Sequence, residues 1–327
     1  MVLPSCAKNR TNENINYSCY SVISYYKIEV LAHPRVALIT CSSIRELTDD
    51  DRPLIGELLG LGVGAEPVIW DDPSVDWSGF DLALIRSTWD YHLSPTAFAS
   101  WLTRLETLGV VLWNPVSVVR ANSDKSYLKS LEAAGVSVVP TCWIDRGAAV
   151  TLDDILASRG WTNAVVKPVV SAGAFRTSRV KRGDAAGQKA LDEVLSHSGA
   201  MIQPYLAEIA AEGEWSFVFL GGEFSHAVLK TPRAGDFRVQ EEHGGHAVLR
   251  EPPSELLAQA REAAIAGPRP WLYARVDGVR RGRELVLVEL ELIEPSLYLA
   301  YAPGAARRLA QAIKARLSAP RPSPTRS

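Results

Sequence analysis

A strongly apolar stretch near the carboxyl terminus, residues 287–295, carries three glutamates. A β-strand places alternate side chains on one face, so Glu289 and Glu291 are expected to project side by side. Two carboxylates in a half-buried strand repel each other and lose hydration unless a cation lies between them. A divalent metal such as Mg²⁺ would satisfy both. A strand with one solvated face is the alternative interpretation of this stretch alone.

The bulk composition is that of a globular protein of about two domains. The chain has 327 residues, 47% of them hydrophobic and 22% charged. Its net charge of −2 provides no basic field for nucleic acid. The four cysteines are scattered, which fits a reducing cytoplasm, and no apolar run reaches the about 18 residues of a membrane span. We therefore expect a cytoplasmic protein that binds a small molecule and neither nucleic acid nor membrane.

The expected fold class is α/β, and it begins with a parallel βαβ domain. Strands predicted at 36–40, 66–70, 81–85 and 110–113 alternate with helices predicted at 48–61 and 95–108. In such sheets, ligands bind beyond the carboxyl ends of the strands. The polar and aromatic segment from Arg86 to His92 leaves one such end and is a candidate pocket wall. An ordinary loop is the alternative.

The second half is expected to be α+β, with antiparallel strands in two subdomains around a cleft. Helices are predicted at 123–134, 152–158 and 254–266, and strands at 136–139, 164–167, 201–204, 215–220, 224–230, 271–279 and 284–293. The predicted domains are 35–121 and 122–317, with a hinge near 203–206. Residues 1–34 are predicted to be an extension outside the fold, and residues 318–327 a disordered tail.

Three closely spaced glycines, Gly60, Gly62 and Gly64, do not indicate a dinucleotide-binding loop. They follow a predicted helix and lead into a strand, whereas the fingerprint requires the reverse order. The chain also lacks the G-x-x-x-x-G-K-[ST] phosphate loop. Any ATP would have to be bound in another way.

Two lysines and a loop of small residues are candidates for phosphate binding. Lys167 ends an apolar strand, where its ammonium group needs an anion. The small residues at 171–174 would let backbone N–H groups approach phosphate oxygens. Lys125 lies at a predicted helix start and could reach the same phosphates. Taken alone, either lysine is more often a surface residue, with its stem packed on the protein and its ammonium group in water.

Six short motifs follow one another along residues 35–317. They are Asn122-x-x-Lys125, Val166-Lys167-Pro168 with its loop, Gln203 to Leu206 before Gly213-Glu214, Asp236-Phe-Arg238 before Gly244-Gly245, Arg275-Val-Asp277, and Glu289-Leu-Glu291. In this order they resemble the ATP-grasp superfamily, in particular its glutathione synthetase and D-alanine–D-alanine ligase branches. Segments 87–92, 222–226 and 289–298 are most similar to the O-ureido-serine cyclo-ligases of cycloserine biosynthesis. The resemblance implies an ATP-grasp fold, with a βαβ pre-ATP-grasp domain and two α+β subdomains enclosing ATP.

The resemblance also implies which residues bind the nucleotide. They are Lys125 and Lys167 at the phosphates, Ser171 and Gly173 in a closing loop, Gln203, Tyr205 and Leu206 at the adenine, and Glu214, or Glu208 in its place, at the ribose.

Asp277, Glu289 and Glu291 are implied as metal ligands, and a hairpin would place Asp277 opposite the two glutamates. The last ligand is commonly asparagine in relatives. The additional charge of Glu291 would tighten metal binding or favour two Mg²⁺ ions, with Mn²⁺ as an alternative metal.

Three basic residues are implied in catalysis. Arg275 would share a strand face with Asp277 and stabilise charge on the transferred phosphoryl group, or form only a structural ion pair. Lys230 and Arg238 would add cations for a substrate carboxylate or the γ-phosphate, or be solvated loop charges. Two histidines, His226 and His243, are further candidates for contact with the substrate.

The implied activity is that of an ATP-dependent carbon–nitrogen ligase. The γ-phosphoryl group of ATP would convert a carboxylate into an acyl phosphate, which an amine nitrogen then attacks. A nitrogen of the same molecule would close a ring, as in the conversion of O-ureido-D-serine to D-cycloserine. The alternatives are an intermolecular amino-acid or peptide ligase of the glutathione synthetase type and a nucleotide-binding protein without catalysis. Relatives of this kind often form dimers, so a homodimer is also implied.

Overall fold

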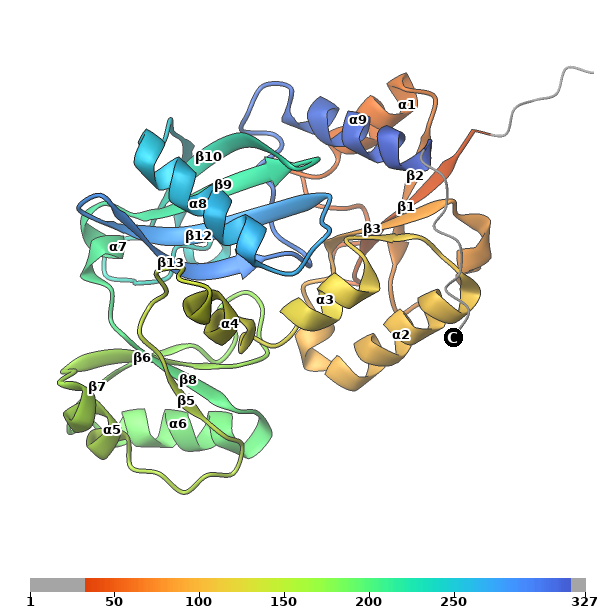
Figure 1. The fold of residues 1–327 in the computed structure, drawn as a ribbon. Helices are drawn as coiled ribbons and strands as arrows, with labels where there is room; N and C mark the ends of the chain where they lie inside the picture. Colours follow the sequence, from red (N-terminus) through yellow and green to blue (C-terminus); the bar gives the residue numbers. More distant parts are fainter. Residues whose placement is uncertain (1–32, 319–327) are drawn as a thin grey trace, which may run out of the picture. The chain divides into compact units, whose positions relative to one another are not determined.

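The computed structural model describes residues 33–318, which contain three β-sheets with helices packed on them (Figure 1). A parallel sheet comes first along the chain, and two antiparallel sheets follow. This arrangement confirms the predicted α/β class. The predicted extension at 1–34 and tail at 318–327 lie, apart from residues 33, 34 and 318, outside the described residues.

The first sheet has the strand order β2-β1-β3-β4. Its strands are β1 (Arg35–Thr40), β2 (Gly64–Ile69), β3 (Leu82–Ser87) and β4 (Leu112–Trp113). The connecting elements are α1 (Pro53–Gly60), η1 (Trp77–Gly79), η2 (Tyr91–Leu93), α2 (Pro95–Leu108) and α3 (Val116–Asn122). Leu38 and Ile39 are both fully buried, in separate apolar clusters on opposite faces of the sheet. Burial on both faces explains why these strands are continuously apolar.

The helix predicted over 48–61 is shorter in the structure, because α1 begins only at Pro53. Proline suits the first helical turn, where its fixed φ is helical and its missing N–H is not needed. Thr48 and Asp51 form a turn instead, in which the Asp51 N–H donates to the Thr48 carbonyl at 3.2 Å. The acidic residues 49–51 therefore lie in a loop.

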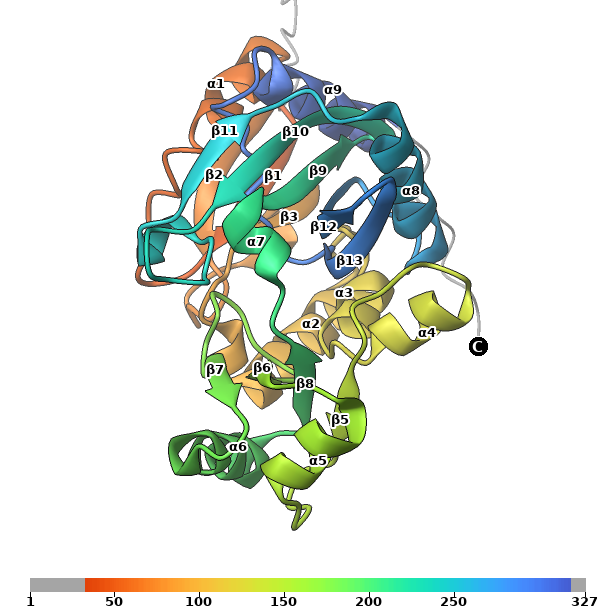
Figure 2. The same ribbon diagram turned by 90° about the vertical axis from the view of Figure 1, so that its left-hand side faces the viewer.

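The smaller antiparallel sheet has the order β5-β8-β6-β7. Its strands are β5 (Cys142–Ile144), β6 (Asn163–Pro168), β7 (Ser178–Lys181) and β8 (Ala200–Pro204). Helices α5 (Leu152–Arg159) and α6 (Ala185–His197) pack on one face, as Figure 2 shows. The alternating burial of β6 follows from this one-sided cover, because Ala164 and Val166 enter the apolar cluster while Lys167 points away from it.

The larger antiparallel sheet has the order β11-β10-β9-β12-β13. Its strands are β9 (Glu214–Leu220), β10 (Glu223–Thr231), β11 (His246–Leu249), β12 (Tyr273–Arg281) and β13 (Glu284–Glu291). The remaining elements are α4 (Tyr127–Ala133), α7 (Ala207–Ala211), η3 (Glu241–His243), α8 (Ser254–Ala266) and α9 (Ala305–Leu317). Leu256 and Ala260 of α8 pack against Leu290 in one apolar cluster on this sheet.

Some predicted elements were wrong. The helix predicted over 123–134 begins only at Tyr127, as α4, because the preceding turn places the Lys125 N–H 2.8 Å from the Val169 carbonyl. The strand predicted over 136–139 forms only a single bridge, between Val138 and Leu287. The prediction also omitted α3, β5, β7, β11, α6, α7 and α9. Short edge strands depend on a partner strand, which local sequence does not reveal.

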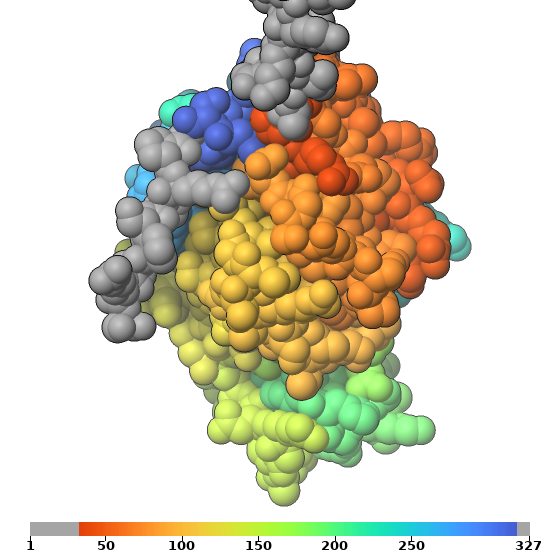
Figure 3. Space-filling model, turned by 90° about the vertical axis from the view of Figure 1, so that its right-hand side faces the viewer, coloured from red at the N-terminus to blue at the C-terminus, as the bar shows by residue number. Residues whose placement is uncertain are grey.

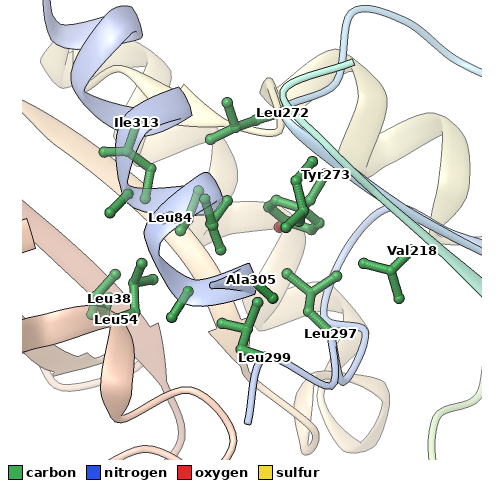
Figure 4. Packing of buried hydrophobic residues seen from close by; sticks show 14 of the residues in the cluster. Leu38, Leu54, Leu84, Val218, Leu272, Tyr273, Leu297, Leu299, Ala305 and Ile313 are labelled. Atoms are coloured by element: carbon green, nitrogen blue, oxygen red, sulfur yellow. The ribbon is translucent and has the colours of Figure 1, made fainter. Parts of the chain in front are cut away.

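One apolar cluster joins the first sheet to the larger antiparallel sheet. Figure 4 shows Leu297 and Leu299 between Leu38 of β1 and Val218 of β9, with Ile313 above Leu38, and all five belong to the same buried cluster. The segment 297–313 includes most of α9. This segment therefore lies between the two sheets and holds them together.

A buried polar network reinforces the same junction. Arg86 at the end of β3 is fully buried, donates to Asp51 at 2.8 Å and donates to the Pro295 carbonyl at 2.7 Å. The Tyr273 hydroxyl lies 2.9 Å and 2.7 Å from the carbonyl oxygens of Ile85 and Ile293, which share its one proton. Arg86 is therefore structural, and its prediction as part of a pocket wall was wrong.

The first sheet also presents a broad outer surface. In Figure 3 its helices, coloured orange to yellow, cover much of the face, and the smaller antiparallel sheet extends below them. The helices on this face cover the strands of the first sheet. A ligand is therefore expected at the carboxyl ends of the strands, which the helices do not cover.

Replacing Arg86 by leucine should lower the free energy of unfolding by about 3–5 kcal/mol, because the buried Asp51 carboxylate loses its partner. Urea denaturation measures the change. Arg52→Leu is the matched control, since Arg52 pairs with Asp49 at the surface, and it should change the free energy by less than about 1 kcal/mol. Equal losses in the two variants would contradict a special contribution of the buried pair.

Candidate active site

A cavity of about 900 Å³ is lined by residues from all three sheets and their loops. Apart from Glu208, the alternative to Glu214, the residues predicted to bind nucleotide or metal or to act in catalysis all line it: Lys125, Lys167, Ser171, Gly173, Gln203, Tyr205, Leu206, Glu214, Lys230, Arg238, Arg275, Asp277, Glu289 and Glu291. Trp89, Tyr91, His92 and His243 line it as well. Arg86, Glu208 and His226 lie outside it. The structure thus brings the candidates together, whereas the role of each stays a prediction.

The pairing of β12 with β13 places the acidic candidates face to face. Asp277 lies opposite Glu289, and Arg275 lies opposite Glu291. Each carboxylate has a basic partner: Lys125 contacts Glu289 at 2.7 Å, and Arg275 contacts both Glu291 and, at 2.8 Å, Asp277. Acidic and basic groups therefore alternate across the sheet at this point.

Asp277 is the most extensively bonded group of the site. It accepts from the Ser216 hydroxyl at 2.6 Å, from Lys230 at 3.2 Å and from Arg275. Burial acts to raise its pKa, but Arg275 and Lys230 outweigh burial and lower the pKa to about 2. Burial acts to lower the pKa of Lys230, but Asp277 and Glu214 raise it well above its usual value. Both groups are therefore charged at neutral pH.

The three acidic candidates have the donor chemistry of a magnesium site. Their carboxylate oxygens are the hard ligands that Mg²⁺ takes, and they lie on two adjacent strands. Within residues 33–318, no group of three or more histidine, cysteine or acidic side chains is arranged as a formed metal site. Lys125 and Arg275 neutralise the carboxylates instead. The donor set fits the ion, and these basic partners would have to share the carboxylates with it.

The phosphate-binding candidates form the neighbouring part of the cavity. Lys125 donates to the Ser171 carbonyl at 2.9 Å, so it connects Glu289 with the small-residue loop. Among the residues described here, Lys167 forms no ion pair, and burial lowers its pKa. A half-buried ammonium group without a bonded anion favours an anionic ligand at this point.

The residues predicted to bind adenine lie at the end of β8 and in the segment that follows it. Gln203 at the end of β8 donates to the Thr141 hydroxyl at 2.9 Å. The Tyr205 ring is covered by the Arg179 guanidinium group at 4.0 Å. Of the two ribose candidates, Glu214 lines the cavity and contacts Lys230 at 2.6 Å, whereas Glu208 pairs with Arg281 outside it.

Two loops, the one after β6 and the one that contains Arg238, line the part of the cavity with Lys125 and Lys167, called here the phosphate end. Phe175, in the loop after β6, contacts the His92 ring of the first domain at a centroid distance of 4.7 Å. Ala174 and Arg176 in this loop have positive φ angles of 56° and 50°. Such angles are unfavourable for residues with a Cβ and indicate a loop held by its surroundings. Arg238 lies in a second loop, where it pairs with Asp236 at 2.8 Å.

Several cavity residues were not found by sequence analysis, notably Asp50, Gln240, Glu294 and Tyr301. Asp50 was assigned to a helix start, and Gln240 lies in a loop without periodicity. Burial, together with the neighbouring charge of Glu291, raises the pKa of Glu294 to about 8. Residues far apart along the chain that meet at one cavity leave no local sequence signal.

His226 was a wrong candidate for substrate contact. Its Nε2 lies 3.0 Å from the Leu297 carbonyl and its Nδ1 lies 2.9 Å from the Ser225 hydroxyl, with the ring buried. The neutral imidazole satisfies both contacts by donating from Nε2 and accepting at Nδ1. His226 therefore fastens β10 to the segment between the two sheets.

The comparisons with known proteins agree with this geometry. Residues 36–114 match the family model of the N-terminal domain of D-cycloserine synthetase DcsG. The chain is 31% identical over 303 residues to the cycloserine biosynthesis protein DcsG of Streptomyces lavendulae, covering 86% of this chain and 98% of that protein. This chain belongs to the DcsG family of ATP-grasp ligases. The crystal structure of D-cycloserine synthetase DcsG has a TM-score of 0.78 and 30% identity, over 86% of this chain and 99% of that one.

More distant relatives support the same fold for this DcsG-family chain. Glutathione synthetase of Bradyrhizobium diazoefficiens is 27% identical over 285 residues, which are 84% of this chain and 80% of that protein. D-alanine–D-alanine ligase of Bacillus anthracis complexed with ATP has a TM-score of 0.62 and 16% identity, over 87% of this chain and 97% of that one. The predicted ATP-grasp fold is confirmed, and ATP-grasp ligases bind ATP with Mg²⁺. In the part of the chain that the structure covers, no helix is both long and apolar enough to span a bilayer.

The buried imidazole of His226 predicts a loss of stability in mild acid. Burial lowers its pKa from 6.5 to about 4, so between these values only the unfolded chain binds the proton. The free energy of unfolding should fall as the pH drops through this range, by up to about 3 kcal/mol from this group. Urea denaturation at about pH 7, 6 and 5 should show a shallower fall for His226→Gln than for the unmodified chain. Parallel pH profiles would contradict the assignment.

Proposed function

We propose that this DcsG-family chain closes O-ureido-D-serine to D-cycloserine at the expense of ATP. The observation that carries the proposal is the similarity to the Streptomyces lavendulae protein over 98% of its length, at 31% identity. The cavity supports it with a row of basic groups for phosphates beside an acidic cluster for a metal. Ligation through an acyl phosphate needs this combination, together with exclusion of water.

The proposed nucleotide site uses the predicted residues of the cavity. Lys125 and Lys167 would bind the phosphate groups, and the loop with Ser171 and Gly173 would close over them. Gln203, Tyr205 and Leu206 would contact the adenine, and Glu214 the ribose. The absence of a bonded anion at Lys167, among the residues described, supports this orientation of ATP.

The proposed metal ligands are Asp277, Glu289 and Glu291, with two Mg²⁺ ions bound and Mn²⁺ as an alternative. Three carboxylates on facing strand positions supply enough negative charge for two ions. When bound, the metal would neutralise negative charge on the β- and γ-phosphates of ATP.

The basic side chains have separate proposed tasks. Arg275 donates to Asp277 and, through Nη1, to the Ser296 carbonyl at 3.0 Å, so its guanidinium group is fixed before the reaction. A fixed charge stabilises the transferring phosphoryl group and the tetrahedral intermediate without reorganisation. Lys230 would contribute a second permanent charge, and Arg238 a third from its loop.

The atoms of the proposed reaction balance only if the carbamoyl group leaves. Attack by the nitrogen bonded to the side-chain oxygen forms the ring bond and breaks the acyl–phosphate bond, releasing phosphate. This nitrogen still carries the carbamoyl group of O-ureido-D-serine, which D-cycloserine lacks. One water molecule must therefore cleave that group as carbamate after ring closure. The products are D-cycloserine, carbamate, ADP and phosphate.

The cellular setting is part of the proposal. Cys41 and Cys142 are free thiols in the structure, which supports the reducing cytoplasm expected from the sequence. A homodimer is proposed from the resemblance to the ATP-grasp ligases alone.

Mass spectrometry of the purified protein with Mg-ATP and O-ureido-D-serine tests the function. D-cycloserine and ADP should appear in equal amounts. ADP that forms only when other amino acids are supplied would instead indicate an intermolecular ligase, as the 27% identity to a glutathione synthetase allows. No ADP with any amino-acid substrate would indicate nucleotide binding without catalysis.

Replacing Glu289 by glutamine should reduce the rate of D-cycloserine formation by more than about 100-fold, because a metal ligand loses its charge. Glu284→Gln is the matched control, since Glu284 lies on the same strand and is exposed. Thermal denaturation of both variants shows whether the chain stays folded. Undiminished activity of Glu289→Gln would contradict the proposed metal site.

A further inference from the structure

Four cavity residues have a buried side-chain atom without a hydrogen-bond partner among the described residues: the imidazoles of His92 and His243, and the side-chain oxygens of Asp50 and Gln240. The two oxygens can only accept a hydrogen bond when Asp50 is ionised, and the proposed chemistry does not use them. In the part of the chain described, neither Asp50 Oδ2 nor Gln240 Oε1 has a hydrogen-bond partner, although both are buried and both residues line the cavity. A buried polar atom without a hydrogen-bond partner lowers the stability of the fold by about 1–3 kcal/mol. An unpaired acceptor at a binding cavity therefore indicates that a bound ligand donates a hydrogen bond to it.

Asp50 is held so that only one of its oxygens is free. The Ala300 N–H donates to Oδ1 at 3.0 Å, while Oδ2 has no partner within residues 33–318. The next residue, Asp51, is anchored by the buried ion pair with Arg86. The loop therefore presents the carboxylate in one orientation. Burial raises the pKa of Asp50 to about 6, which a bound cation would reverse.

Gln240 is held by its backbone. Its carbonyl accepts from the N–H groups of His243 and Gly245, at 2.9 Å and 3.0 Å. A Cβ added at Gly245 would lie only 2.1 Å from the Val239 carbonyl oxygen, so only glycine lets the chain close here. Val239 beside Gln240 is buried. The backbone is thus fixed, and the amide side chain is the part left for a ligand.

The two residues lie on one wall of the cavity. Glu241, next to Gln240, accepts a hydrogen bond from the Tyr301 hydroxyl, and Tyr301 directly follows Ala300, the partner of Asp50. The Tyr301 ring contacts the Tyr298 ring at 5.3 Å, and Tyr298 in turn lies 5.9 Å from the Arg275 guanidinium group. A short chain of contacts therefore connects this wall with the proposed reaction centre.

The wall with Asp50 and Gln240 differs from the phosphate end of the cavity in how its carboxylates are paired. At the phosphate end, the carboxylates of Asp277, Glu289 and Glu291 each contact a basic side chain. Asp50 contacts none among the residues that the structure places. Aromatic rings beside an unpaired carboxylate suit a primary ammonium group, which both attract.

We propose that Asp50 and Gln240 form the substrate-specificity subsite: Asp50 binds the α-ammonium group, and the Gln240 amide pairs with the terminal carbamoyl group. This inference rests on the proposed cyclo-ligase function. A primary amide and a carbamoyl group each carry one acceptor and N–H donors, so they can exchange two hydrogen bonds in either orientation of the glutamine. The subsite thereby distinguishes a ureido substrate from an ordinary amino acid.

Two shortened substrates test the two contacts separately. O-amino-D-serine lacks the carbamoyl group but can still close to D-cycloserine, and 3-(ureidooxy)propanoate lacks the α-ammonium group. The unmodified enzyme should prefer O-ureido-D-serine over each by about 10- to 100-fold in kcat/KM, from the hydrogen bonds lost. The ratio of kcat/KM for two substrates, measured on one enzyme preparation, does not depend on the fraction of folded enzyme. Partial misfolding of a variant therefore cannot imitate the result.

Each variant should lose one preference and keep the other. Gln240→Leu should convert O-ureido-D-serine and O-amino-D-serine with similar kcat/KM while still discriminating against 3-(ureidooxy)propanoate. Asp50→Asn should convert O-ureido-D-serine and 3-(ureidooxy)propanoate with similar kcat/KM while still discriminating against O-amino-D-serine. Gln240→Asn, which keeps the amide chemistry, should retain part of the carbamoyl preference. The controls Gln311→Leu and Asp71→Asn, at exposed positions, should keep both preferences.

The failure of this inference differs from the failure of the proposed function. If the unmodified enzyme forms no D-cycloserine from either serine derivative, the cyclo-ligase proposal fails, and this inference with it. If D-cycloserine forms but each variant keeps both preferences, only the subsite assignment is overturned. Equal loss of both preferences in each variant would also overturn it, because a general distortion and not two separate contacts would explain the effect.

Discussion

The buried carboxylate of Asp277 organises the charges of the cavity. It accepts hydrogen bonds from Ser216 on β9, Lys230 on β10 and Arg275 on its own strand, and it faces Glu289 on β13. A buried carboxylate without such partners costs several kcal/mol. Because the partners lie on neighbouring strands of one sheet, the pairing of the strands and the charge network stabilise each other. The same arrangement places acidic and basic groups where a nucleotide and its metal need both.

The first sheet contributes to the site by holding the chain that leaves β13. Arg86 and Trp89 donate to the carbonyls of Pro295 and Glu294, and Tyr273 donates to that of Ile293. The chain that follows Pro295 contains Tyr298 and Tyr301, which lie on the cavity wall beside Asp50. The two antiparallel sheets thus supply the residues proposed to bind the nucleotide, and loops of the first sheet line the rest of the cavity.

Sequence analysis located the elements whose signal is local. The helices α2 and α8 have the predicted bounds, because each begins at a proline or serine and keeps an apolar periodicity to its end. The predicted helix over 123–134 failed where the turn at Lys125 bonds to Val169, a contact that periodicity does not report. The edge strands β5 and β7 are short, and their conformation depends on pairing with β8 and β6.

Strand periodicity was sufficient to predict that Asp277, Glu289 and Glu291 share one side of a hairpin, because backbone geometry sets the period of a strand. The order of the motifs that resemble the ATP-grasp ligases is likewise a property of the sequence. The structural roles of His226 and Arg86, and the positions of Asp50 and Gln240 at the cavity, follow from the packing of the folded chain. Asp50 and Ala300 are 250 residues apart in the chain. They meet because the first sheet and the larger antiparallel sheet both pack against the segment 297–313. Such contacts depend on the burial of side chains from distant elements, which no local pattern contains.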